Sequence, residues 1–155
     1  AKMPEPQRST FDLREVVTEV VDLYSHAASV ALKMDLPTDG FLVHSDRDQL
    51  SRVFNNLIKN AKQAIEHEEG MVKVEMRITG ALATVEVRDN GKGIPDEIGQ
   101  RVFEPRFSTK NSGMGLGLAM VRKIVETSDG RIWFETEVGV GTSFFVELPA
   151  ANDTE

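Results

Sequence analysis

Two neighbouring stretches in which apolar and polar residues alternate most constrain how this chain can fold. In residues 71–78 and 82–89 every second side chain is apolar, and Gly80 stands between the two stretches. A period of two places the apolar side chains on one face of a β-strand, and a glycine between two such strands favours a tight turn. The sequence therefore predicts an antiparallel hairpin with one buried face. The side chains expected on that face are Val72, Val74, Met76, Ile78, Ala83, Val85 and Val87.

Continuing this alternation by one position would turn the carboxylate of Asp89 toward the apolar interior. A carboxylate buried without a partner is costly, so we expect Asp89 to have one. Gly91 and Gly93 follow in residues 89–94 (DNGKGI), and because they lack a Cβ they let the chain turn sharply and a flat group approach. This arrangement indicates a site for a base with an exocyclic amine. The alternative is an ordinary hairpin, since Asn-Gly is a strong turn dipeptide.

The clearest helical pattern runs from a cap at Ser45 or Asp46 to about His67. Its apolar side chains fall within a stripe about 140° wide, which predicts one face packed in the core. They are Leu50, Val53, Phe54, Leu57, Ile58, Ala61, Ala64 and Ile65.

Three amides, Asn56, Asn60 and Gln63, share one border of this apolar face, whereas Asn55 lies on the far side. Asn is a poor residue for a helix interior, so two of them one turn apart suggest a function that compensates for the loss. Their oxygens could ligate Mg²⁺, which takes few protein ligands when phosphates supply the rest. The alternative is a solvated flank of the helix.

The remaining patterns predict the other elements of the fold. They are a helix from its cap Asp12 to about Ala28, strands at 30–36 and 41–44, a short helix from Pro95 to about Val102, a polar loop at 103–112, a largely buried helix beginning near Leu116, and strands at 131–135 and 142–148. Thr142 is expected to be the one hydroxyl on an apolar strand face. This order indicates an α/β (α+β) two-layer sandwich, in which helices cover one face of a mixed, mostly antiparallel sheet.

Composition excludes several classes of function. The 155 residues suit one domain and include no cysteine, so thiol catalysis and Cys-based zinc sites are excluded. A formal net charge of −7 argues against a general nucleic-acid or anionic-membrane surface. No run of 18 apolar residues occurs, so we expect no membrane contact by this chain.

Glycines precede the predicted buried helix in the run Gly113-Met114-Gly115-Leu116-Gly117-Leu118. Glycines at a helix N-terminus expose N–H groups and the positive end of the helix dipole to an anion. The alternative is a close-packed glycine turn. The run is not spaced as G-x-G-x-x-G, and the chain contains no G-x-x-x-x-G-K-[ST], so neither a dinucleotide fold nor a P-loop is indicated.

Five motifs together resemble, in order and spacing, the N, G1, F, G2 and G3 boxes of bacterial sensor histidine kinases, and look most like the nitrogen-regulation branch. The resemblance spans roughly residues 10–149 and implies the Bergerat fold of gyrase, mismatch-repair and heat-shock chaperone ATPases. The motifs are residues 56–61 (NLIKNA), 89–94, 103–110 (FEPRFSTK), 113–118 and Gly141-Thr142.

The resemblance implies a role for each matched residue. Asp89 would take the adenine amine, helped by a water near Thr142, and Asn60 would ligate magnesium. Catalysis would depend on Asn56 facing the phosphates, on Asn60 and on Lys110. The other residues implied to contact or enclose ATP, with Phe103 and Phe107 fastening a lid, are Gly91, Gly93, Ile94, Thr109, Gly113, Gly115, Leu116, Gly117 and Leu118.

Kinases of this class phosphorylate a histidine on a separate dimerising hairpin. His26, His44 and His67 lack the expected sequence context and are interpreted as structural or surface residues. The resemblance thus implies that residues 1–9 are a linker from a missing hairpin, residues 10–149 an ATP-binding catalytic domain and residues 150–155 a polar tail.

The implied activity is transfer of the γ-phosphoryl group of Mg-ATP to that histidine, for relay to a response regulator. A cytoplasmic domain, monomeric by itself and belonging to a homodimeric, possibly membrane-anchored parent, is expected from the same resemblance. Two alternatives are a serine kinase of the anti-sigma-factor kind on the same fold, and a nucleotide-binding regulatory module that has lost transfer.

Overall fold

The computed structural model describes residues 5–25, 30–105 and 114–152, with the backbone only for residues 114–116. In chain order, its elements are β1 (Arg8–Asp12), α1 (Leu13–Tyr24), β2 (Ala31–Asp35), β3 (Leu42–Asp46), α2 (Arg47–Gln63), β4 (Met71–Thr79), β5 (Leu82–Asp89), the 3₁₀ helix η1 (Gly99–Phe103), α3 (Met114–Thr127), β6 (Arg131–Glu137) and β7 (Gly141–Pro149).

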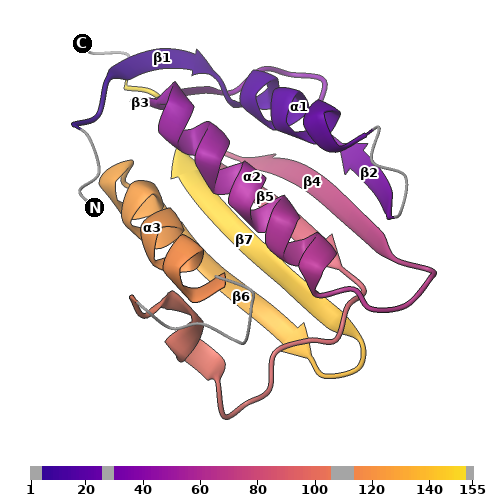
Figure 1. Cartoon of the computed structure of the whole chain (residues 1–155). Helices are drawn as coiled ribbons and strands as arrows, with labels where there is room; N and C mark the ends of the chain where they lie inside the picture. Colours follow the sequence, from indigo (N-terminus) through magenta and orange to yellow (C-terminus); the bar gives the residue numbers. More distant parts are fainter. Residues whose placement is uncertain (1–4, 26–29, 106–113, 153–155) are drawn as a thin grey trace.

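A five-stranded sheet in the order β2-β4-β5-β7-β6 forms one layer. Only the β2–β4 pair in this sheet is parallel, so the sheet is mixed and mostly antiparallel, as predicted. Helices α1, α2 and α3 lie side by side across one face of it (Figure 1). Strands β1 and β3 form a separate antiparallel pair at the ends of the helices. The predicted two-layer sandwich is confirmed.

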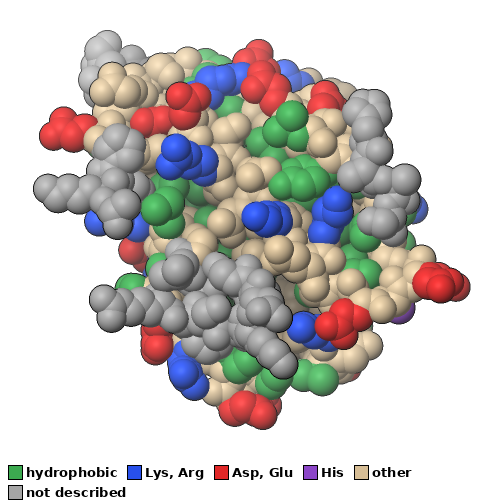
Figure 2. Space-filling model, viewed as in Figure 1, with side chains coloured by type: hydrophobic (Ala, Val, Ile, Leu, Met, Phe, Trp, Pro, Cys, Tyr) green, Lys and Arg blue, Asp and Glu red, His purple; other side chains and the backbone are tan. Residues whose placement is uncertain are grey.

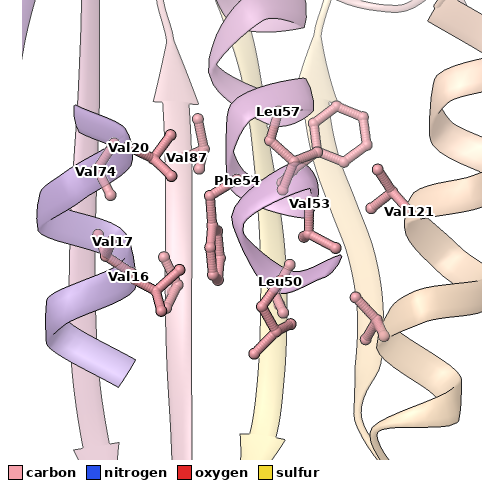
Figure 3. Packing of buried hydrophobic residues seen from close by; sticks show 14 of the residues in the cluster. Val16, Val17, Val20, Leu50, Val53, Phe54, Leu57, Val74, Val87 and Val121 are labelled. Atoms are coloured by element: carbon pink, nitrogen blue, oxygen red, sulfur yellow. The ribbon is translucent and has the colours of Figure 1, made fainter. Parts of the chain in front are cut away.

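The hydrophobic core lies between the helices and the sheet. Figure 3 shows Phe54 and Leu57 of α2 among valines of α1 and the strands, with Val121 of α3 on the other side. Phe54 is 1% exposed, and the inward valines of the β4–β5 hairpin are equally buried. Burial of this kind contributes about 1.5–3 kcal/mol for each large side chain. It fixes α2 over the centre of the sheet.

Aspartates begin the first two helices, as the sequence predicted. The side chain of Asp12 accepts a hydrogen bond from Arg14 N at 3.0 Å, and that of Asp46 accepts one from Gln49 N at 3.0 Å. Of the two residues proposed to cap the second helix, Asp46 is therefore the cap. Ser45 instead pairs with the hydroxyl of Ser128 at 2.6 Å in the interior.

Both helices end earlier than expected. Helix α1 ends at Tyr24 rather than near Ala28, and residues 26–29 lie outside the described part of the chain. Helix α2 ends at Gln63 rather than near His67, because the carbonyl of Ala64 accepts a hydrogen bond from Lys92 N at 2.9 Å. This tertiary contact draws the chain out of the helix.

Three further predictions need correction. The helix expected over 95–102 is a turn followed by the 3₁₀ helix η1. Helix α3 is not buried all round, because Arg122, Lys123 and Glu126 are exposed and Met120 is 39% exposed. Strand β1 begins at Arg8, inside the segment expected to be a linker.

Charged side chains are distributed unevenly on the helix side of the molecule. Figure 2 shows lysine and arginine side chains across the middle of this face and acidic ones mainly round its margin. The formal charge of −7 does not therefore make this face uniformly repulsive to an anion.

Candidate functional site

A row of polar side chains crosses the end of the sheet, on the face that the helices cover. Asp89 of β5 pairs in register with Thr142 of β7, which pairs in turn with Thr136 of β6. The next row toward the centre is apolar and contains Val87, Phe144 and Phe134. Asp89 is 6% exposed, so the inward direction predicted from the alternation is confirmed.

Asp89 finds its partners in the backbone rather than in a cation. Its Oδ1 accepts hydrogen bonds from Gly91 N at 2.8 Å and Thr142 N at 3.3 Å. Burial raises the pKa of Asp89, and the two N–H groups oppose that rise. Because both of these hydrogen bonds use Oδ1, Oδ2 is the oxygen that can accept a hydrogen bond from a ligand. No described lysine or arginine forms an ion pair with Asp89.

The loop after β5 is held between α2 and the β6–β7 turn. A Cβ at Gly91 would collide with the carbonyl of Ala64, and one at Gly93, where φ is +80°, would collide with the backbone of Glu137. Lys92 O also accepts a hydrogen bond from Gly139 N at 2.9 Å. The close approach that these glycines permit is therefore to the protein's own backbone.

Asn90 and His67 fasten the same loop from the other side. Asn90 accepts from Met71 N at 2.8 Å and donates to Glu69 O at 2.9 Å. The His67 Nδ1 accepts from Glu69 N, so its Nε2 carries the proton and donates to Asn90 O at 2.8 Å. The ordinary Asn-Gly hairpin is thus ruled out, and His67 has a structural role.

The amide pair on α2 lies under the start of α3. Asn60 is 6% exposed, and its Nδ2 donates to Asn56 Oδ1 at 3.0 Å. A Cβ at Gly117 would collide with the Asn56 amide, so the backbone of α3 passes directly over it. Asn55 points away, as expected, and its Oδ1 accepts a hydrogen bond from the hydroxyl of Tyr24. Gln63 is exposed at the end of α2 and does not join the pair.

The other predicted site residues are divided between the core and undescribed positions. Phe103 is 5% exposed and packs against Phe134 with ring centroids 5.9 Å apart, so its side chain belongs to the core. Leu118 is fully buried in the core. Gly115 and Leu116 lie in α3, but their surroundings are not described. The predictions for Phe107, Thr109, Lys110 and Gly113 fall outside the described residues.

An apolar hollow of about 330 Å³ adjoins the loop after β5. Ile94 connects it to the polar row, because Ile94 lines the hollow and its N–H donates to Thr136 Oγ1 at 2.8 Å. The hollow is lined by Lys92, Gly93, Ile94, Pro95, Ile98, Val102 and Val138.

The sequence analysis missed Thr136. Thr142 is the one hydroxyl on the buried face of its own strand, as predicted, but the hydroxyl of Thr136 on the neighbouring strand β6 lies 2.8 Å from it. The signal was available, because the alternation of Ile132 and Phe134 reaches Thr136 in one more step. The expected strand was ended at Glu135, whereas β6 continues to Glu137.

Among the described residues, two kinds of feature are absent. None of the described helices is long and apolar enough to cross a membrane. The described part of the chain also brings together no cluster of three or more His, Asp or Glu side chains that could hold a metal ion.

Comparison with known proteins defines the class to which this arrangement belongs. Residues 45–152 match the model of the family described as histidine kinase-, DNA gyrase B- and HSP90-like ATPases, and the chain belongs to this family. It is 33% identical to sporulation kinase C of Bacillus subtilis over 98% of its length, and 42% identical to the sensor histidine kinase ZraS of Klebsiella oxytoca over 89%. It spans about a third of each relative, 37% and 30% respectively.

Solved structures extend the likeness to three dimensions. The nucleotide-free catalytic domain of histidine kinase ThkA superposes with a TM-score of 0.82 at 30% identity, covering 94% of this chain and 99% of that one. The fold is therefore that of a histidine kinase catalytic domain, and the resemblance read from the five motifs is confirmed at the level of the family. ATP is the ligand to which this class of domain points.

Proposed function

We propose that this domain binds Mg-ATP at the end of β5 and donates the γ-phosphoryl group to a histidine on a separate dimerisation hairpin, for relay to the aspartate of a response regulator. The observation that supports this most directly is Asp89, a buried carboxylate with backbone partners on one oxygen and no described cation. Such a group is an incomplete acceptor that a ligand can complete.

Adenine matches this acceptor better than guanine does. The exocyclic amine of adenine would donate to Asp89 Oδ2, whereas the carbonyl oxygen of guanine would face a carboxylate and be repelled. Thr142 lies beside Asp89 and would hold a water that contacts the base. The apolar hollow at Ile94 supplies an adjoining apolar surface for the base.

Asn60 is the residue that fits a magnesium ligand. Its amide nitrogen is occupied by Asn56, so its oxygen is the atom that can face a cation. A single neutral oxygen is enough for Mg²⁺ when phosphates and water complete the shell. Magnesium, when bound, would neutralise charge on the phosphates during transfer.

The chemistry near Asn56 favours transfer over hydrolysis. By the family resemblance a glutamate stands at this position in gyrase-like ATPases and activates water, but an amide cannot act as a general base. The nucleophile must then come from outside as an imidazole, and the domain would act chiefly by positioning. Lys110 would hold the phosphates and the backbone of Gly117 would assist, a role supported by its closeness to the amide of Asn56.

The proposal requires two partners, a dimerisation hairpin in the parent protein and a separate response regulator. A solved structure at 28% identity, with a TM-score of 0.78, contains histidine kinase ThkA in complex with response regulator protein TrrA. That kinase therefore binds a response regulator. We assign the segment before β1 to the link from the hairpin, residues 8–149 to the catalytic domain and residues 150–155 to a tail. A homodimeric parent with this domain in the cytoplasm follows from the same proposal.

Titration calorimetry tests the binding part of the proposal. The chain is titrated with a non-hydrolysable ATP analogue with and without Mg²⁺, and with a GTP analogue as a control. We expect the chain to bind the ATP analogue more tightly than the GTP analogue, and Mg²⁺ to strengthen this binding. In Asn60→Ala the affinity should no longer depend on Mg²⁺. Equal affinity for both nucleotides would contradict the role of Asp89.

Transfer is tested by adding the dimerisation hairpin as a separate protein, together with radiolabelled ATP. Acid-labile phosphate on its histidine is expected. Acid-stable phosphate on a serine would instead identify a serine kinase, and ATP binding without any transfer would identify a regulatory module.

A further inference from the structure

The polar row at the end of the sheet has a third member that no family motif includes. Thr136 lies in register with Thr142, on the side away from Asp89. Its Oγ1 accepts the Ile94 N–H at 2.8 Å and lies 3.2 Å from Gly141 O and 2.8 Å from Thr142 Oγ1. One hydroxyl thus joins the loop after β5 to the start of β7.

The hydrogen count at this hydroxyl decides what Thr142 can offer to a ligand. The hydroxyl of Thr136 has a single proton to donate, and the carbonyl oxygen of Gly141 can only accept a hydrogen bond. When Thr136 donates to Gly141 O, as the 3.2 Å contact allows, Thr142 must donate its own proton to Thr136. The lone pairs of Thr142 Oγ1 are then the part of that hydroxyl left for other contacts, so Asp89 and Thr142 together form an acceptor-only edge.

We propose that Thr136 is a positioning residue for nucleotide recognition, which holds the hydroxyl of Thr142 as an acceptor and fixes the Ile94 backbone at the same point. This inference rests on the proposed function and assigns part of its base selectivity to a residue that need not touch the base. The exocyclic group that would meet the row is an amine donor in adenine, whereas in hypoxanthine it is a carbonyl acceptor. An acceptor-only edge favours the first.

The test compares ATP and ITP affinities of wild type and Thr136→Val by titration calorimetry. Valine keeps the shape and β-propensity of threonine but removes the hydroxyl, so Thr142 becomes free to donate toward the ligand. We expect the ATP dissociation constant to rise about tenfold and the preference for ATP over ITP to fall about fivefold. Thr136→Ser should restore both values, because it restores the hydroxyl.

The matched control is Thr84→Val, which makes the same change on β5, on the sheet face away from the helices. It should leave both dissociation constants unchanged. Urea unfolding of each variant establishes that it is folded, and Thr136→Ala removes the same hydroxyl with a smaller side chain if valine prevents folding. Double substitution with Thr142→Val should cost less than the two single costs added together.

The outcomes separate this inference from the proposed function. A purely structural role would weaken ATP and ITP binding equally, so an unchanged preference in Thr136→Val or Thr136→Ala would overturn the inference while the proposed function stood. Wild-type protein that binds neither nucleotide, or does not prefer ATP, would overturn the proposed function and this inference with it.

Discussion

Two aspartates at the margins of the core receive similar hydrogen bonds and yet differ in kind. Asp12 at the entry to α1 and Asp89 at the end of β5 each accept two backbone N–H groups on Oδ1. Among the described residues, only Asp12 also has a cation, since Arg14 Nη2 lies 2.8 Å from its Oδ2. Within this part of the chain the partners of Asp12 are therefore complete, whereas Asp89 Oδ2 has no described partner.

Their pKa values move in opposite directions for this reason. The side-chain hydrogen bond from Arg14 is the largest cause that lowers the pKa of Asp12. Burial is the largest cause that raises the pKa of Asp89. Asp12 is thus neutralised by its neighbour Arg14, whereas the carboxylate of Asp89 is buried beside no described cation.

The largest effect is expected from Asp89→Asn. An asparagine oxygen can still accept the N–H groups of Gly91 and Thr142, but its amine would face the amine of adenine. We expect the ATP dissociation constant to rise about 100-fold, as befits a hydrogen bond to a charged group. The free energy of unfolding should stay the same or rise, since no charge is buried. Calorimetry and urea unfolding measure the two quantities, and a loss of stability above about 1 kcal/mol would make Asp89 a structural residue.

Asp12→Ala should show the reverse pattern. It removes a helix cap worth about 1 kcal/mol and an ion pair, and leaves the N–H of Phe41 without its acceptor, so the free energy of unfolding should fall by about 2 kcal/mol. The ATP dissociation constant should not change. Asp22→Ala, an exposed position on the same helix, is the control and should cost less than about 0.5 kcal/mol. An ATP affinity that falls with Asp12→Ala would break the comparison.

Arg14→Met should make Asp12 resemble Asp89. The substitution removes the cation and its contacts with the carbonyls of Pro37 and Thr38, so the free energy of unfolding should fall by less than it does for Asp12→Ala. The pKa of Asp12 should then rise, which an NMR titration of its carboxyl group would detect. An unchanged pKa would mean that the backbone N–H groups, rather than Arg14, hold the carboxylate ionised.

The smallest effect is expected in the pH dependence of stability, at below about 1 kcal/mol. The stability from ionised Asp12 is present above the unfolded value of 3.8 and is lost as pH falls through its lower folded pKa. The ionised Asp89 lowers stability above its raised folded pKa, and this loss disappears as the group takes up a proton on acidification. At pH 7, Asp89→Asn should be more stable than wild type and Asp12→Asn less stable. In urea unfolding from pH 7 to 3, the difference between Asp89→Asn and wild type should disappear at a higher pH than the difference between Asp12→Asn and wild type. The opposite order would contradict the two pKa directions.

Local patterns predicted the parts of the fold that depend on one face being buried. The alternation in 71–78 and 82–89 predicted the β4–β5 hairpin and the inward Asp89, both of which the structure confirms. The apolar stripe of α2 is likewise buried as expected. A shift of one residue in the strand alternation would expose the whole apolar set, so this pattern strongly determines the register of the strand.

Tertiary contacts decided where the elements stop. Helix α2 ends where the carbonyl of Ala64 meets Lys92, a residue 28 positions later, and no local signal marks that point. Gln63 is the last residue of α2 and is exposed, so of the three amides on this border the described hydrogen bond joins Asn56 and Asn60. The approach of α3 to Asn56 depends equally on packing.

The sequence by itself determined the family, the two-layer sandwich, the inward Asp89 and the pairing of Asn56 with Asn60, because each follows from periodicity or from motifs in a fixed order. Only the tertiary structure decided that Asp89, Thr142 and Thr136 form one row. That row depends on the register of three strands, and Thr136 is separated from Asp89 by 47 positions in the chain. Hydrogen bonds between strands, rather than neighbouring residues, bring such groups together.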